Sequence, residues 1–457
     1  MSGTAPSLWL FNDYIDEVAP DMDDSTGLAE AMLGLDGFKV LSVVEGPDEL
    51  VVTVETTAVL VACSECGCRA ESQDRMPIEI RDLQCFGRPV RLVWVKRRWR
   101  CRQFDCPVKT WTETDPAVMS RQLITWRGAT EACRQVGELA RPVSKVAAEF
   151  GVCWWTIMNA VIEHGTRLVD DPCRVGPVEQ LGIDETSFLA AKRHRHTTYV
   201  TGVIDLKSRT TIDMFKGNSA SDLRKWTGKA APEWLAGVEV VATDLTDSYR
   251  AGLSPNLTHV IRVADPFHVV RVGNRCLDKV RRRVQNETTG HRGRKDDPLF
   301  KIRKIMLTGN ERLDDKGRER MLLGLRVGDP NDEVLGAWLA KESVREIYLT
   351  RDRAKAETLL DKVITGCADD HVDEIRSLGK TLARWRDEIL AYHDTRASNG
   401  PTEGLNLCVK KVKRCGHGFR SLEHYRLRVL LHTGGVTWPD RPNPPRIRSR
   451  RSPHSVA

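Results

Sequence analysis

The chain has 457 residues, with 70 Lys and Arg against 63 Asp and Glu, a formal net charge of +7 and 13 cysteines. This length allows two to four domains with real cores, so the fold needs no disulfide staples. No uninterrupted apolar run approaches about 18 residues, and Met1 to Asp24 is acidic and contains proline, which argues against a membrane span and a signal peptide. We therefore expect a soluble cytoplasmic protein with no membrane partner.

The cysteines point to a metal site. Their odd number without a secretory context favours reduced thiols over a disulfide framework. After a helical, acidic start, short alternating runs predict strands at Lys39 to Val44, at Leu50 to Thr56 and from Val59 into the first cysteine pair, with a second arm from Val90 to the second pair.

Two close cysteine pairs follow these arms. Cys63 and Cys66, with Cys101 and Cys106, can place four thiolates around one structural zinc, and Gly67 gives the first turn backbone freedom. Cys68 and Cys85 are competing ligands, and a set of buried free thiols is the alternative.

Basic residues flank the second pair and alternate with Trp94 and Trp99. They are Arg88, Arg91, Lys96, Arg97, Arg98, Arg100 and Arg102. This pattern fits a surface that contacts the DNA backbone. A plain solvated face is the alternative.

Residues 142 to 157 fit a helix-turn-helix with its turn at Gly151. The predicted inward positions are Val146, Ala147, Phe150, Val152 and Ile157. The recognition helix would then begin with Cys153, Trp154, Trp155 and Thr156 and present Asn159 one turn later. An ordinary pair of packed helices remains the alternative, because short patterns of this kind arise by chance.

The central stretch is Gln180 to Phe188, a β-prone run that carries Asp184 and pairs as a hairpin with Thr197 to Ile204. Aspartate is rare inside strands and costly to bury without a partner, so a divalent metal is the expected partner. Further along, Thr210 to Phe215 predicts a third strand and Asp222 to Trp234 an amphipathic helix.

A fourth strand from Val238 ends at Asp244, and a fifth, His259 to Val263, ends at Asp265. Asp247 and Asp265 are rivals of Asp244 for a metal, since each could lie near the same sheet edge.

A long, almost entirely helical region follows. Asp265-Pro-Phe-His268 opens a basic helix, and further helices are predicted at Pro298 to Leu307, Asp314 to Gly324, Asp332 to Arg351, Ala354 to Gly366 and Val372 to His393. This stretch is too long for a loop and predicts a folded all-α insertion.

The next helix opens at Ser398 and places Glu403, Asn406 and Lys410 on one face. A helix at Ser421 to His432 precedes a Pro- and Arg-rich tail that is expected to be disordered.

Together these motifs resemble the DDE transposases of the ISL3 insertion-sequence family, from about Phe38 to Gly435. The matching residues are the four cysteines with Arg97-Arg98, Ile183-Asp184-Glu185, Thr243-Asp244-Leu245, Ala264-Asp265-Pro-Phe-His268, and Ser398-Asn399 followed by Glu403, Asn406, Lys410, Lys413 and Arg414. The resemblance implies that Asp184, Asp244 and Glu403 are the catalytic, metal-binding triad. It also implies a ribonuclease-H-like core interrupted by an insertion, and a dimer or DNA-assembled dimer.

Three acids of this kind suit two Mg²⁺ (or Mn²⁺) ions about 3.5 to 4 Å apart that cut a phosphodiester in line and then join the freed 3′ hydroxyl to target DNA. Asp184 is expected to bridge the ions. Asp265 and His268 are expected to support the insertion or contact DNA, Asn399 and Asn406 to support the site, and Lys410, Lys413 and Arg414 to clamp phosphates.

The predicted fold is therefore multidomain α+β: a small β zinc ribbon, a helical helix-turn-helix domain and a mixed α/β ribonuclease-H-like core interrupted by an all-α insertion. The expected boundaries are an N-terminal segment 1–36, a zinc ribbon 37–115, a helix-turn-helix domain 116–175, a core in two parts at 176–268 and 394–436, an insertion 269–393 and a basic tail 437–457.

The predicted function is that of an insertion-sequence transposase. Its partners would be double-stranded DNA, both element ends and target, within the bacterial nucleoid. Two alternatives share most of these features: a transcriptional regulator with a zinc ribbon, a helix-turn-helix and an inactive core, and a structure-selective nuclease that cuts without joining.

Overall fold

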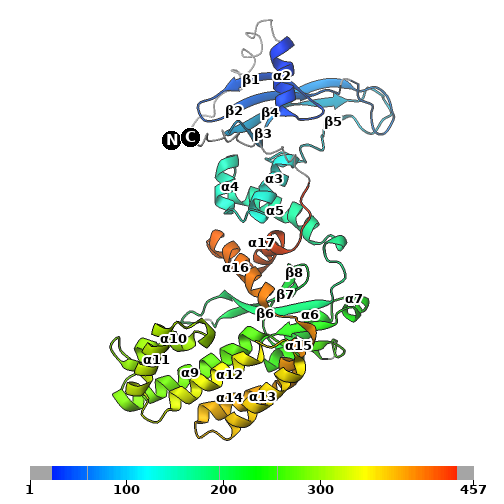
Figure 1. The fold of residues 1–457 in the computed structure, drawn as a ribbon. Coiled ribbons are helices and arrows are strands. Elements are labelled where there is room, and N and C mark those ends of the chain that lie inside the picture. Colours follow the sequence, from blue (N-terminus) through cyan, green and yellow to red (C-terminus); the bar gives the residue numbers. More distant parts are fainter. Residues whose placement is uncertain (1–22, 59, 195, 255, 440–457) are drawn as a thin grey trace, which may run out of the picture. The chain divides into compact units, whose positions relative to one another are not determined.

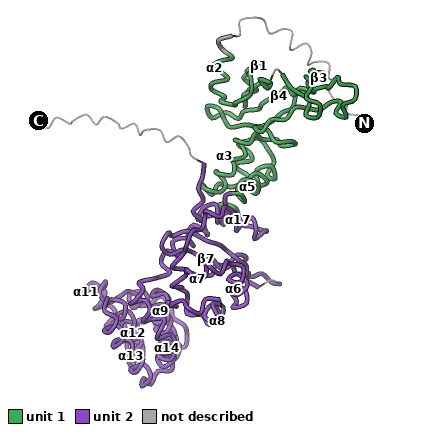
Figure 2. Tube along the Cα trace, turned by 90° about the vertical axis from the view of Figure 1, so that its right-hand side faces the viewer, with its two compact units in different colours: residues 1–167, 415–417 green, residues 168–414, 418–457 purple. Residues whose placement is uncertain are grey.

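The computed structural model describes residues 23–439 except 59, 195 and 255, so the predicted tail lies almost wholly outside the described residues. The chain forms two compact units, residues 1–167 with 415–417, and residues 168–414 with 418–457 (Figure 2). In the described part of the chain, no helix is long and apolar enough to cross a membrane.

A mixed five-stranded sheet dominates the first unit. After helix α2 (Asp23–Leu33), its strands are β1 (Phe38–Glu45), β2 (Leu50–Thr56), β3 (Glu71–Cys85), β4 (Arg88–Arg100) and β5 (Thr110–Thr112) (Figure 1). The order is β1-β2-β4-β3, with β5 beside β4, and β2 runs parallel to β4. The long β3–β4 hairpin turns at Phe86 and Gly87, which both have positive φ.

Two expectations for this sheet were wrong. The run from Val59 to Cys63 was expected as a strand, but among its described residues only Ala62 pairs, in an isolated bridge with Arg69. Strand β3 was missed because its first half is exposed and polar, so it lacks an alternating apolar pattern.

The two tryptophans of β4 pack inside the unit. Trp94 is fully buried against Phe38, and Trp99 is also buried. The predicted DNA-facing surface of basic residues alternating with these tryptophans is therefore corrected: Trp94 and Trp99 face the core, while Arg98 and Arg100 are exposed.

Three helices complete the first unit: α3 (Trp126–Gly137), α4 (Val143–Phe150) and α5 (Trp154–Val169). Gly151 ends α4 with φ of 64°, a left-handed conformation that glycine adopts without strain. Of the predicted inward residues, Val146, Ala147, Phe150 and Ile157 are buried, whereas Val152 is half-buried.

The second unit is built on another five-stranded sheet, of order β10-β9-β6-β7-β8. Strands β6 (Gln180–Leu189), β7 (Thr198–Asp205) and β8 (Thr210–Lys216) pair antiparallel, as the sequence predicts. Strands β9 (Val240–Thr243) and β10 (Ile261–Ala264) add in parallel on the other side of β6. The first strand in sequence is thus the middle strand of the sheet.

Helices connect β8 to β10. The single helix expected at Asp222 to Trp234 is two, α6 (Ala220–Thr227) and α7 (Pro232–Ala236), because the chain breaks between Gly228 and Pro232. The short helix α8 (Asp247–Leu253) was not predicted.

The region after β10 is all helical and has its own apolar core. Its helices are α9 (Pro266–Thr289), α10 (Pro298–Leu307), α11 (Asp315–Gly328), α12 (Glu333–Ile347), α13 (Arg353–Ala368), α14 (Asp373–Arg384) and α15 (Arg386–Thr395). The last two were expected as one helix, but the helix is interrupted at the buried Trp385, whose φ of −107° and ψ of 19° are not helical.

The chain then returns to the sheet. Ala391 at the end of α15 and Ala397 after it pack against β9 and β10. Helix α16 (Gly400–Cys415) follows, and then α17 (Leu422–Thr433), where Thr433 bonds to Thr211 of β8. The helical region therefore interrupts the sequence of the sheet unit and leaves both of its ends beside β9 and β10.

Candidate active site

Asp184 lies on the middle strand of the second sheet, opposite Gly202 of β7. Its carboxylate is half-buried and accepts a hydrogen bond of 2.6 Å from the Asn406 side chain and one of 2.7 Å from the backbone N–H of Glu185. The strand and helix α16 therefore fix its position together.

Asp244 directly follows β9, which runs parallel to β6 with Thr243 opposite Ile183. Both strands consequently deliver an aspartate at the same edge of the sheet, one residue beyond this pair. Nδ1 of His268, on α9, lies against Oδ1 of Asp244.

Glu403 lies in the first turn of α16, and four hydrogen bonds fix this turn: one to β6, one to Asp265 at the start of α9 and two within the turn itself. The Asn399 side chain donates to the Ile183 carbonyl at 3.1 Å, and the Thr402 hydroxyl donates to the Asn399 side chain at 2.7 Å. The backbone N–H of Asn399 donates to Asp265 at 2.7 Å, and that of Glu403 to the Asn399 carbonyl at 3.1 Å. Asn399 therefore links the start of α16 to β6 and to Asp265.

The close approach of α16 to β6 depends on Gly182. A Cβ at this position would lie 2.6 Å from the Thr402 hydroxyl and 2.7 Å from the Asn399 side chain, well inside van der Waals contact. Only glycine leaves room for this turn of the helix.

Asp184, Asp244 and Glu403 line one cavity of about 750 Å³. The other lining residues are Glu185, Thr186, Ser187, His268, Arg271, Gly400, Gly404, Asn406, Leu407, Lys410, Lys413 and Tyr425. The structure therefore brings the three predicted acids to a single cavity. Their carboxylate oxygens are farther apart than the four thiols described below, whose ligand atoms all lie within 4.8 Å of one another.

The rivals of Asp244 lie elsewhere. Asp247 is exposed and pairs with Arg384 at 2.6 Å. Asp265 is buried, caps the start of α9 and accepts a hydrogen bond from the backbone N–H of Asn399. Asp265 therefore holds α9 and α16 together and is too enclosed for the DNA contact that was one of its expected roles.

Burial and charge shift the pKa values in this cavity. Burial, together with repulsion from Asp244, raises the pKa of Asp184 to about 6. Burial also raises the pKa of Asp265. Burial alone would lower the pKa of His268, but the hydrogen bond and charge of Asp244 outweigh it, so this pKa is raised.

Basic residues surround the acids. Lys410 and Lys413 line the cavity; Lys413 donates to the Ser187 carbonyl at 2.8 Å, and its pKa is lowered by burial. Arg414 is exposed and does not line the cavity. Arg271 was not predicted as a site residue, although its position one turn after His268 was a readable signal.

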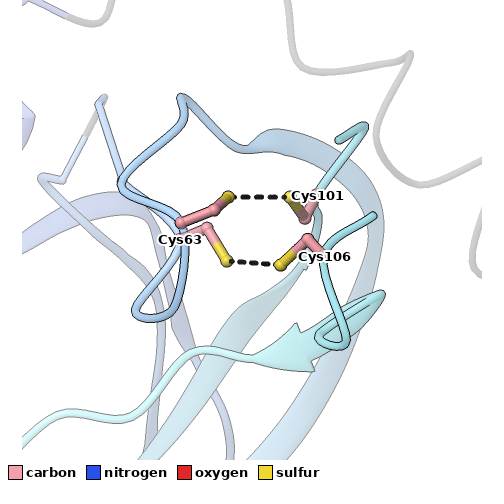
Figure 3. Close-up of side chains that lie close together, drawn as sticks. Cys63, Cys101 and Cys106 are labelled. Atoms are coloured by element: carbon pink, nitrogen blue, oxygen red, sulfur yellow. Dashed lines mark hydrogen bonds between the residues drawn. The ribbon is translucent and has the colours of Figure 1, made fainter. Parts of the chain in front are cut away.

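Four cysteines converge in the first unit. The Sγ atoms of Cys63 and Cys106 are 3.7 Å apart, those of Cys66 and Cys101 are 3.5 Å apart, and all four lie within 4.8 Å of one another (Figure 3). Tetrahedral zinc with Zn–S bonds of about 2.3 Å requires sulfur separations of about 3.8 Å, so the cluster fits one zinc ion. Cys68 and Cys85, the competing ligands, are outside this set.

The predicted DNA-contact residues divide into two groups. Arg97 is buried, with its guanidinium donating to the Thr56 carbonyl at 2.9 Å and pairing with Glu55 at 3.2 Å. It is therefore withdrawn from the expected DNA surface, whereas Arg98 is exposed.

The start of α5 is open to solvent. Trp154 and Trp155 are 40% and 59% exposed and pack edge to face against each other, and Asn159 is also exposed, while Thr156 is half-buried. This helix end therefore presents aromatic and amide groups outward, as the helix-turn-helix prediction requires.

The second unit gathers acidic residues at one edge of a sheet, with basic residues around them, and the first unit carries four cysteines that fit one zinc ion. This combination is typical of enzymes that act on nucleic acid. Comparison with known families agrees. Residues 181–429 match the model of the ISL3 DDE transposases, and residues 60–106 match the zinc finger of the transposases of IS204, IS1001, IS1096 and IS1165.

Relatives extend this similarity over most of the chain. The transposase for insertion sequence element IS1001 of Bordetella parapertussis is 25% identical, over 88% of this chain and 97% of its own length. The transposases for element IS1557 of two Mycobacterium tuberculosis strains, CDC 1551 and H37Rv, are also 25% identical, over 92% of this chain and 98% of theirs.

The chain belongs to the ISL3 family of DDE transposases. It is accordingly an insertion-sequence transposase with a zinc-ribbon domain, an enzyme that binds, cleaves and transfers DNA strands with a divalent metal.

Proposed function

We propose that this transposase cuts and joins DNA at the cavity of Asp184, Asp244 and Glu403, which hold the catalytic Mg²⁺, or Mn²⁺ in its place. The observation that supports this most is that three acids from β6, the end of β9 and α16 line one cavity although they are far apart in sequence. The surrounding sheet order, with the first strand in the middle, supports a ribonuclease-H-like core with an all-α insertion.

The donors fit such a metal. They are carboxylate oxygens, which Mg²⁺ and Mn²⁺ prefer. Burial and, after it, repulsion from Asp244 raise the pKa of Asp184, and a bound cation would offset both effects. When bound, two such ions activate the attacking water and stabilise the leaving 3′ oxygen of an in-line phosphodiester displacement.

The chain's own residues orient these acids. Asn406 fixes the Asp184 carboxylate and His268 fixes that of Asp244, as outer partners of metal ligands commonly do. Lys410 and Lys413 lie on the same cavity and are placed to hold the phosphates beside the scissile bond. We assign Arg414, which is exposed on the same helix, to more distant backbone contact.

We further propose that the first unit recognises the terminal inverted repeats. Cys63, Cys66, Cys101 and Cys106 would hold one structural zinc, and Arg98 would contact the DNA backbone beside it. Trp154, Trp155, Thr156 and Asn159 would enter the major groove from the start of α5. The domain boundaries expected from the sequence belong to this proposal.

Because two element ends must be joined, we propose a homodimer that assembles on DNA. Light scattering with and without end DNA should give two chains per pair of ends. A monomer under both conditions would remove this part of the proposal.

The test of the catalytic assignment is cleavage of a labelled end oligonucleotide in Mg²⁺ by wild type, by Asp184→Asn and by the control Asp247→Asn. We expect the first variant to lose cleavage and strand transfer by more than the roughly 100-fold caused by loss of an outer partner of a metal ligand. The control should cut normally, because Asp247 pairs with Arg384 outside the cavity.

Other outcomes separate the alternatives. Sequence-specific binding without cutting by any of the three proteins would identify a regulator with an inactive core. Cutting without joining, and without preference for element ends, would identify a structure-selective nuclease.

A further inference from the structure

Helix α9 carries a line of basic side chains that begins at the catalytic cavity. Arg271, Arg275 and Lys279 are four residues apart, so they share one face of the helix, and all three are exposed. Arg271 lines the catalytic cavity. Arg275 and Lys279 line a second hollow, of about 450 Å³, between α9 and α14. The line therefore leads from the acids out over the helical region.

None of these three cations forms an ion pair in the described part of the chain, although the charge of Lys279 helps to lower the pKa of Glu374. No carboxylate oxygen of the described residues lies within 4.0 Å of any of them, whereas the next basic residues on the helix are paired: Arg281 and Arg282 with Asp278, and Arg283 with Glu333 and Glu374. The helix thus neutralises its distal positive charges and leaves those nearest the cavity available.

The second hollow also holds two acids, but each is engaged. Glu374 pairs with Arg283 at 2.9 Å, and Asp373 pairs with Arg376. The remaining lining is small and aliphatic or hydroxylic: Val272, Cys276, Ser377, Leu378 and Thr381. No aromatic side chain is among these lining residues, so the hollow offers charge and hydroxyls without a platform on which a base could stack.

The spacing of the cations fits a nucleic-acid backbone. From Arg271 to Lys279 the helix rises about 12 Å, at 1.5 Å per residue. A duplex strand presents one phosphate per about 3.4 Å of axis, so the line spans roughly three to four phosphates. Contacts of this kind position DNA without reading its sequence.

We propose that Arg271, Arg275 and Lys279 form a phosphate track that guides DNA away from the catalytic cavity across α9. This inference rests on the proposed function, because it extends the DNA path beyond the scissile phosphate. The bound backbone belongs either to the DNA flanking the element end or to the target duplex, and both offer the same phosphate chemistry.

The test uses full-length Arg275→Gln/Lys279→Gln, which leaves Arg271 and the cavity intact. Its matched control is Arg320→Gln/Lys362→Gln, which also removes two exposed cations, on α11 and α13. Three probes are compared over a range of salt: an end duplex that stops at the cleavage position, the same end with about 20 base pairs of flanking DNA, and a target duplex offered to protein already bound to a cut end.

The track predicts about tenfold weaker binding by the double variant to one of the two longer probes. It also predicts that the slope of log K against log salt concentration becomes shallower by about 2, since each of the two lost phosphate contacts removes about 0.9 from this slope. If the double variant binds the flanked end more weakly, the track contacts flanking DNA. If it binds the target duplex more weakly, the track contacts target DNA. The short end and the control variant should bind as wild type does.

Equal affinities and slopes for wild type and the double variant on all probes would overturn the track. Equally weakened DNA binding by the double variant and by the control would overturn it as well, since the effect would then come from the lower net charge of the protein. Cleavage of the short end by wild type is scored separately, so failure of the proposed function is seen as absent cutting and failure of the track as unchanged binding.

Discussion

At the scale of single residues, the site depends on a carboxylate held where its charge is unfavourable. Burial and the neighbouring Asp244 raise the pKa of Asp184 to about 6. In the unfolded chain this group ionises at its ordinary, lower pKa. The protonated Asp184 therefore contributes its full stabilisation when the pH is below the pKa of the unfolded chain. This stabilisation is lost as the pH rises through about 6, the pKa in the folded protein. The metal-free protein at neutral pH carries this cost.

Asp184→Asn should remove that cost. In chelator at pH 7.5 we expect the variant to be more stable than wild type by about 1 to 3 kcal/mol, since one pKa unit corresponds to about 1.4 kcal/mol. The difference should shrink as pH falls from 6 toward 4. Thermal and urea unfolding of both proteins in EDTA would measure it.

Saturating Mg²⁺ should offset most or all of this difference, because ligand binding stabilises only the protein that holds it, by about 2.7 kcal/mol at 100 times Kd. If Asp184→Asn is less stable than wild type in EDTA at pH 7.5, the carboxylate is not strained by its surroundings, and the proposed electrostatics are wrong.

At the scale of elements, the site is assembled where α16 packs onto β6. The contact is possible because Gly182 has no side chain and because Asn399 links the Ile183 carbonyl, Thr402 and Asp265. Glu403 lies one residue beyond Thr402. A shift of this helical turn would therefore move the third acid away from the two on the strands.

Gly182→Ala should consequently impair catalysis through position alone. A methyl group 2.6 Å from the Thr402 hydroxyl forces the helix outward, and overpacking of this kind costs about 1 to 3 kcal/mol. We expect a lower unfolding temperature and loss of most end cleavage, with DNA binding by the first unit retained.

Gly202→Ala is the matched control, since it adds a Cβ on the neighbouring strand whose nearest contact is 4.0 Å away. Wild-type cleavage by Gly182→Ala would show that the approach of α16 to β6 does not set the position of Glu403.

The sequence predicted most elements because their signals are local. The antiparallel strands of the second sheet, the helices that follow β10 and the turn at Gly151 carry strong periodicity or a glycine with positive φ. Where the signal depends on tertiary packing, prediction failed. Strand β3 has no apolar alternation in its first half, and nothing in the sequence marks the buried Trp385 as the residue that separates α14 from α15.

The same limit applies to the site. Asp184 was visible in the sequence because aspartate is unusual inside a strand. The roles of Asp244 and Glu403 came from the family resemblance. The burial of Arg97, the bond from Asn399 to Asp265 and the contact between His268 and Asp244 were not, because each depends on a partner far away in the chain. Spacing alone does not distinguish a cation that faces DNA from one that satisfies a backbone carbonyl.

At the scale of the whole molecule, a cluster of four cysteines in one unit is separated in sequence from the acids in the other. Cys101→Ser should remove one of four converging thiolates, and we expect it to lose about one equivalent of zinc and its specific binding to element ends. Metal analysis of purified protein and end-binding assays measure the two effects.

Cys68→Ser is the control for this prediction. Cys68 is exposed and lies outside the cluster, although it contributes its backbone carbonyl to the N–H of Cys63 at 2.9 Å. It should keep its zinc and its DNA binding. Full zinc in Cys101→Ser would refute the assignment of the cluster.

The most direct measurement is anomalous scattering from crystals of the whole protein soaked in Mn²⁺. Bound manganese should be within about 2.4 Å of an Asp184 oxygen and of at least one oxygen from Asp244 or Glu403, and should be missing from Asp184→Asn crystals. Manganese held at other carboxylates, with Asp184 uncoordinated, would contradict the proposal that these three acids form the catalytic metal site.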